Sequence, residues 1–156
     1  MNLTRNLLPF VEELTLRKNE DKSLSLNFRE KYTSDTYFPI SFASEGTIIM
    51  IELVVALYFE EKPLTIIEEP ARSMHPSLIS RVMDMLKEAS EKKQIIVTTH
   101  NSEVVKYADL EDLLFIFRDK EGFSTISKPG EKEGVKTFLK NEIGIEELYI
   151  QNLLEV

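Results

Sequence analysis

The chain has 156 residues, of which 42% are hydrophobic, so it is long enough for one compact domain with an apolar core. It contains no cysteine, which excludes a disulfide scaffold and a thiolate metal site and favours a cytosolic protein. The formal net charge is −8 and the basic residues are scattered among acids, so we do not expect this chain to bind nucleic acid directly.

The N-terminal part is expected to contain a β-hairpin. The first ten residues look like a short helical lead-in. They do not contain a basic segment followed by an apolar core, so we do not expect a signal peptide. Residues 11–17 and 23–28 alternate apolar and polar side chains, with the polar residues 19–21 between them. This alternation predicts two antiparallel strands. A polar segment dotted with aromatic residues follows over 31–39.

An apolar helix is expected next, over 48–59. Ser44 is its best N-cap candidate, because a serine hydroxyl can accept hydrogen bonds from the amides of the first turn. Thr47 stands three residues later in place of Glu or Gln, so this is not a capping box. The helix is apolar on nearly all sides and should be buried. It is interrupted by Glu52 and is too short to span a bilayer.

Two predicted strands end in residues that carry chemistry. The apolar run 64–67 leads into Glu68, Glu69 and a proline, and the β-branched run 95–99 leads into His100. In open α/β sheets, ligands bind at the carboxyl ends of the parallel strands. The two carboxylates and the histidine therefore predict a metal or phosphate site with a general base and a polar sensor.

The remaining elements complete an alternating pattern. Pro76 suits the first turn of a helix, and apolar residues recur at helical spacing from there to Ala89. Later elements are a helix over 102–107, a strand over 113–117, a strand over 123–127 that can pair with it across residues 119–122, and two short helices within 133–154 separated near Gly144. The order strand–helix–strand–helix–strand predicts an α/β fold with a parallel sheet covered by helices.

Four segments resemble motifs of the C-terminal half of an ABC-type ATPase. More narrowly, they resemble AAA-type, ABC-like ATPases related to the OLD family, found in prokaryotic defence and repair systems. Ser44-Glu45-Gly46-Thr47 resembles the signature loop, Leu64 to Glu69 the Walker B strand, Ala71 to His75 the D-loop, and Thr98-Thr99-His100 the switch strand. The resemblance implies a parallel-sheet, P-loop NTPase-like lobe with flanking helices and an N-terminal β-hairpin.

On this resemblance we expect a single domain over 1–156, the C-terminal lobe of an ABC-like ATPase. Residues 1–40 would be the lead-in and hairpin, residues 41–107 the motif core, and residues 108–156 the C-terminal strands and helices.

The resemblance implies ATP and Mg²⁺ as cofactors and gives the strand ends their roles. Glu68 would hold the magnesium ion, through water, because hard oxygen ligands suit that ion. Glu69 would orient or deprotonate the attacking water, and His100 would contact the γ-phosphate.

The resemblance also implies surfaces that face another subunit. Ser44, Glu45, Gly46 and Thr47 would offer amides, hydroxyls and the positive end of a helix to a γ-phosphate held by that subunit. His75, at the end of the D-loop-like segment, would belong to the same cofactor-binding set and to communication across the dimer. A large side chain at position 46 is expected to block the phosphate while leaving thermal stability almost unchanged.

Two features depart from the family pattern. Glu68 stands where ABC ATPases generally carry aspartate, which moves the carboxylate by roughly 1.5 Å. No Gly-x-x-x-x-Gly-Lys-Ser/Thr occurs, since the five glycines stand at 46, 122, 130, 134 and 144. The chain would thus supply half an active site, and alone it should be inactive.

Three functions remain open. The first is that the chain would be the C-terminal lobe of a composite ATPase whose P-loop lies elsewhere. The second is that it would be a catalytically inactive ABC-like interaction or regulatory module. A magnesium-dependent hydrolase using Glu68 and Glu69 alone is the third, although no further acids converge in the sequence. Glu69 and His100 together favour the first. Which process the ATPase would power lies in partner domains.

The first function implies particular partners. The chain would work with a P-loop-bearing ATPase chain or a homologous subunit, in the cytoplasm and away from the membrane. It should also self-associate, because the strand 64–68 would lack its P-loop neighbour and leave an unpaired edge. A rearranged hairpin at 11–28 covering that edge is the alternative.

Overall fold

The computed structural model describes residues 8–33, 35–135 and 144–151, which form two compact units, Met1–Thr98 and Thr99–Val156. Each unit is described by itself. The lead-in predicted for the first ten residues lies mostly outside the described residues. The same holds for much of the first helix predicted within 133–154.

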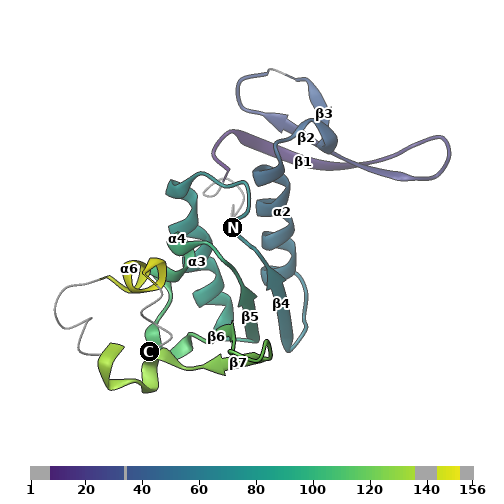
Figure 1. Ribbon diagram of the computed structural model, residues 1–156. Helices are drawn as coiled ribbons and strands as arrows, with labels where there is room; N and C mark the ends of the chain where they lie inside the picture. The colour runs from purple at the N-terminus through teal and green to yellow at the C-terminus, as the bar shows by residue number, and fades with distance from the viewer. Residues whose placement is uncertain (1–7, 34, 136–143, 152–156) are drawn as a thin grey trace. The chain divides into compact units, whose positions relative to one another are not determined.

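The first unit begins with a three-stranded antiparallel sheet in the order β1-β2-β3 (Figure 1). Strands β1 (Val11–Lys18) and β2 (Leu24–Glu30) form the predicted hairpin. The short strand β3 (Tyr37–Pro39) was not expected from its polar surroundings and pairs with β2. The rings of Phe28 and Phe38 lie 5.9 Å apart and anchor it.

The predicted strand–helix–strand unit is confirmed (Figure 1). Strands β4 (Leu64–Glu68) and β5 (Gln94–Thr98) pair in parallel without a bulge. Helix α3 (Pro76–Ser90) connects them, with Pro76 in its first turn as expected. One stripe of α3 is buried, namely Ile79, Val82, Met83, Met85, Leu86 and Ala89.

Helix α2 (Glu45–Tyr58) begins at Ser44, whose Oγ accepts a hydrogen bond from the Thr47 amide at 3.2 Å, as predicted. Its burial is less complete than the sequence indicates. Val55 is 47% exposed and Glu52 is exposed, so one side of the helix is open to solvent. No helix in the described residues is long and apolar enough to cross a membrane.

Two side chains form hydrogen bonds between α2 with its following loop and the β4–α3–β5 segment. Lys93, just before β5, donates from Nζ to the carbonyl oxygens of Ala56 at 3.0 Å and Glu60 at 2.7 Å. The ammonium thereby satisfies one carbonyl in the last turn of α2 and one in the loop that follows it. The Tyr58 hydroxyl donates to a Glu88 carboxylate oxygen on α3 at 3.0 Å. These contacts hold α2 beside the parallel strands.

Strand β4 keeps an open edge in the described part of the chain, where it pairs only with β5. Alternate residues of the two strands are exposed although they are apolar: Leu64 is 42%, Ile66 60% and Ile96 43% exposed. The alternative that the hairpin covers this edge is wrong, because β1 pairs with β2 and β2 with β3, whereas none of them pairs with β4, whose Ile66 stays exposed.

The second unit contains the short helix α4 (Ser102–Tyr107), the hairpin β6 (Phe115–Arg118) and β7 (Ser124–Ser127), and helix α6 (Ile145–Ile150). The predicted pairing of the two strands is confirmed. Among the described residues only β4 and β5 pair in parallel, and the strand predicted as the third parallel one pairs antiparallel with β7. The described residues also contain the 3-10 turns η1 (Ile40–Phe42), η2 (Leu110–Asp112) and η3 (Pro129–Glu131).

Helix α6 supplies the apolar centre of the second unit. Leu148 is fully buried against Val135, with Leu110 and Phe115 packed around them. The ring of Tyr149 meets Phe115 edge-on, with centroids 5.4 Å apart. The C-terminal helix expected after Gly144 therefore completes this unit's core.

Candidate functional site

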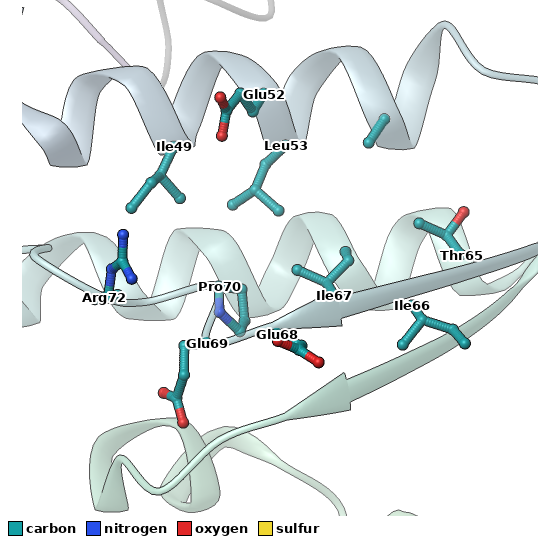
Figure 2. Close-up of a pocket in the computed structure, with 11 residues that line it drawn as sticks. Ile49, Glu52, Leu53, Thr65, Ile66, Ile67, Glu68, Glu69, Pro70 and Arg72 are labelled. Atoms are coloured by element: carbon teal, nitrogen blue, oxygen red, sulfur yellow. The ribbon is translucent and has the colours of Figure 1, made fainter.

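Glu68 and Glu69 stand at the carboxyl end of β4, as predicted. Glu68 is exposed and pairs in register with Thr98. The Glu69 amide donates to the Thr98 carbonyl at 2.8 Å, which carries the ladder one residue past the strand. The two carboxylates point in different directions (Figure 2). They are thus separate groups at one sheet edge, able to take different roles.

Glu69 adopts an unusual backbone conformation. Its φ is +46°, in the left-handed region that non-glycine residues rarely occupy. The conformation reverses the chain, because the Glu69 carbonyl accepts from the Arg72 amide at 3.0 Å. Such strain costs about 1–3 kcal/mol and is concentrated at functional sites. The observed outlier supports a functional role for Glu69.

A groove of about 470 Å³ runs along the open edge of β4 (Figure 2). Consecutive residues of the strand line it, from Thr65 to Glu68, so it follows the edge and not one face of the sheet. Helix α2 forms the opposite wall with Ile49, Glu52, Leu53 and Ala56. The groove is apolar along the strand and ends beside the two carboxylates.

The start of α2 contacts the loop 71–75 that follows β4. The Glu45 carboxylate accepts from the Arg72 guanidinium at 2.5 Å and from the Ser73 hydroxyl at 2.6 Å. The hydrogen bond from Ser73 has the largest effect in lowering the pKa of Glu45 below its ordinary value, and the bond from Arg72 has the next largest. The positive charge of Arg72 lowers this pKa further. The structure thus brings the two motif-like segments together. The sequence did not indicate this pairing, which spans 27 residues.

The residues predicted to bind a phosphate are partly used within the chain. Ser44 Oγ caps α2 and lies 2.8 Å from Thr47 Oγ1. A Cβ on Gly46 would lie 2.7 Å from the Ser73 carbonyl oxygen. Our expectation that a large side chain at position 46 would leave stability unchanged is therefore wrong. Gly46 is needed for close contact with the loop 71–75.

The two histidines lie in different units. His75 caps α3: its Nδ1 accepts from the Ser77 amide at 3.2 Å and lies 2.9 Å from Ser77 Oγ. His100 belongs to the second unit and is exposed, and its carbonyl accepts from the Tyr149 hydroxyl at 3.3 Å. The sequence did not single out Tyr149, since nothing local links α6 to His100.

The donor set decides what metal the chain can hold. The described residues contain no group of three or more His, Cys, Asp or Glu side chains arranged for a metal ion. Magnesium is commonly held by one or two carboxylates together with substrate phosphates and water. The exposed Glu68 carboxylate therefore fits a magnesium ion that arrives with a nucleotide, and not a metal bound by the chain alone.

The parallel β–α–β unit with carboxylates at its strand end is that of an α/β protein of the P-loop NTPase fold. Residues 4–106 match the family described as "AAA domain, putative AbiEii toxin, Type IV TA system". Because this match covers more than half of the chain, the protein belongs to that family. The chain is accordingly an ATPase-like domain of the AAA type.

Solved structures similar to the chain come from SMC proteins. One comes from work on ATP-driven dimerization and DNA-stimulated activation of SMC ATPases. It has a TM-score of 0.64 at 18% identity, covering 89% of this chain and 86% of the other. An SMC head bound to the C-winged helix domain of ScpA gives a TM-score of 0.64 at 20% identity, covering 80% of this chain and 39% of the other. These likenesses show the fold.

A curated relative is protein MJECL43 of Methanocaldococcus jannaschii, described as uncharacterized. It is 25% identical over 91 residues, which is 56% of this chain. The matched part is 24% of that protein, so the chain spans about a quarter of the relative's length.

Proposed function

We propose that the chain is the C-terminal lobe of an ABC-like ATPase and supplies part of a composite site for ATP and Mg²⁺. The P-loop would lie on another chain or in another part of the protein. The observation that carries the proposal is Glu69, an acid held in a strained left-handed conformation at the end of β4. The family match and the SMC-like fold agree with it.

Each of the residues at the strand ends and at the start of α2 would have a separate role in binding or hydrolysing ATP. Glu68 would hold the magnesium ion that accompanies the nucleotide and neutralises phosphate charge. Glu69, one residue beyond the strand, would orient or deprotonate the attacking water. His100 would contact the γ-phosphate. The helix start at Ser44 and Thr47 would face a γ-phosphate held by another subunit.

The groove along β4 supports the placement of the P-loop elsewhere. The sequence has no Gly-x-x-x-x-Gly-Lys-Ser/Thr, and an unpaired strand edge favours the addition of another strand. A P-loop-bearing lobe that adds a strand to β4 would bury Ile66 and face α2 across the groove. We propose such a lobe, or a homologous subunit, as the partner.

Hydrolysis assays test the proposal. The chain alone should hydrolyse ATP at background rate, and a complex with a P-loop-bearing partner should be active. In that complex Glu69→Gln should lower kcat by about 100- to 10,000-fold while nucleotide binding persists, because an amide cannot act as a base. Glu61→Gln, an exposed glutamate in the loop before β4, is the matched control.

Two results would reject the proposal in different ways. If Glu69→Gln kept near-normal turnover while Glu68→Gln lost it, the roles of the two acids would be reversed. If no P-loop-bearing partner activated the chain, the inactive interaction module would be the better description.

A further inference from the structure

Glu45 joins two segments that are distant in the sequence. Both oxygens of its carboxylate are used: Oε1 accepts from Arg72 Nη2 and Oε2 accepts from Ser73 Oγ. Glu45 is the first residue of α2, whereas Arg72 and Ser73 belong to the loop after β4. The helix start and this loop are therefore held together by charge-assisted hydrogen bonds.

The backbone follows the same contact. Ser73 has a φ of +57°, a conformation that costs free energy for a residue with a side chain. Its carbonyl oxygen occupies the space that a side chain at position 46 would need. The loop thus keeps a strained backbone conformation while it lies against Gly46. The hydrogen bonds that Arg72 and Ser73 donate to Glu45 offset that strain.

The loop is also continuous with Glu69. The Arg72 amide donates to the Glu69 carbonyl at 3.0 Å, and the Met74 amide donates to the Ala71 carbonyl at 3.3 Å. A path of direct contacts therefore runs from α2 through Glu45 and Arg72 to the turn that sets the direction of Glu69.

We propose that Glu45 is a positioning residue that fixes Glu69 relative to the start of α2. This inference rests on the proposed function, because it gives Glu69 a catalytic role. On this view Glu45 does not contact the nucleotide. It makes the helix start and the loop 71–75 move as one body, so that a subunit pressing on either one moves the Glu69 turn.

Amide hydrogen exchange on the full chain tests the contact without ATP. In Glu45→Gln, the amides of Arg72 and Met74 should exchange about 3- to 10-fold faster, because an exposed charged pair contributes only modestly. Amides of α2 over 50–57 should keep their wild-type rates, as should all amides in the Glu61→Gln control. Unchanged exchange at Arg72 and Met74, or faster exchange along all of α2, would overturn the inference.

Kinetics in an active complex test the positioning role. Glu45→Gln should lower kcat about 10-fold and leave the KM for ATP within about 2-fold, because the nucleotide contacts remain. Arg72→Gln should give a similar loss, and the double variant should be no worse than either single one, because both act through one pair. An unchanged kcat, a raised KM alone, or additive losses would contradict the role.

The two proposals fail in distinguishable ways. If the wild-type complex hydrolyses no ATP, the proposed function fails and takes the positioning role with it. If the wild-type complex is active and Glu45→Gln has the same kcat, only the inference about Glu45 is wrong.

Discussion

Replacing Gly46 with alanine tests how closely α2 and the following loop are packed. The added Cβ would lie 2.7 Å from the Ser73 carbonyl oxygen and 3.5 Å from the Ser73 carbonyl carbon. Both atoms belong to the backbone, so the loop must shift as a whole instead of turning one flexible side chain aside. That shift would also strain the hydrogen bonds that Arg72 and Ser73 donate to the Glu45 carboxylate.

The expected magnitude follows from two opposing effects. Overpacking of this kind costs about 1–3 kcal/mol. Alanine in place of glycine within a helix returns up to about 1 kcal/mol, and less in the first turn. The net expectation for Gly46→Ala is a loss of about 1–2 kcal/mol in the free energy of unfolding. For a unit of this size, that lowers the Tm by roughly 5–15 °C.

Thermal unfolding followed by circular dichroism measures this loss. Gly134→Ala is the control, because a Cβ at position 134 would have no neighbour within 4 Å and should not lower the Tm. If Gly46→Ala raised the Tm, helix propensity would outweigh the contact, and the close packing of the loop on α2 would be refuted.

Three further outcomes are expected. Lys93→Met should lower the free energy of unfolding, measured by urea denaturation, by about 1–2 kcal/mol, because it removes the hydrogen bonds to the Ala56 and Glu60 carbonyls. An unchanged urea midpoint would show that these bonds do not contribute to stability. Burial, and after it the hydrogen bond to Glu88, raise the pKa of Tyr58 to about 12. The stability that the neutral hydroxyl contributes to the folded state is therefore full below pH 10, the ordinary pKa of tyrosine, and is lost as the pH rises through 12. Tyr58→Phe should therefore weaken the fall in stability above pH 10 in urea titrations, and an identical pH profile would refute this linkage. Ile66→Lys should weaken self-association in sedimentation without lowering the Tm, because Ile66 is 60% exposed; a wild type that sediments as a monomer would contradict it.

Elements that depend on local patterns could be predicted from the sequence. Alternation predicts the hairpin of β1 and β2, and Ser44 and Pro76 predict the starts of α2 and α3. The parallel pair β4–β5 follows from two apolar runs separated by an amphipathic helix. In each case the signal lies within a few residues of the feature it predicts.

The pairing of the strand after α4 was predicted only in part. The order of elements favoured a third parallel strand, yet Asp119 Oδ1 accepts from the Glu121 and Phe123 amides. This local turn pairs β6 with β7.

At the candidate site, the two glutamates were placed at the strand end correctly, but the hydrogen bonds of Glu45 were not foreseen. Its partners are more than 25 residues away, and the sequence did not indicate the close approach of the Ser73 carbonyl oxygen to Gly46.

The open edge of β4 also bears on the amount of this chain that a cell can keep in solution. An apolar strand edge without a neighbour is a template for aggregation, and Ile66 and Ile96 add exposed apolar surface beside it. Chain made in excess of whatever covers that edge should precipitate or be degraded. The abundance of the chain would then follow the abundance of its partner, and synthesis of the two together would give the higher yield.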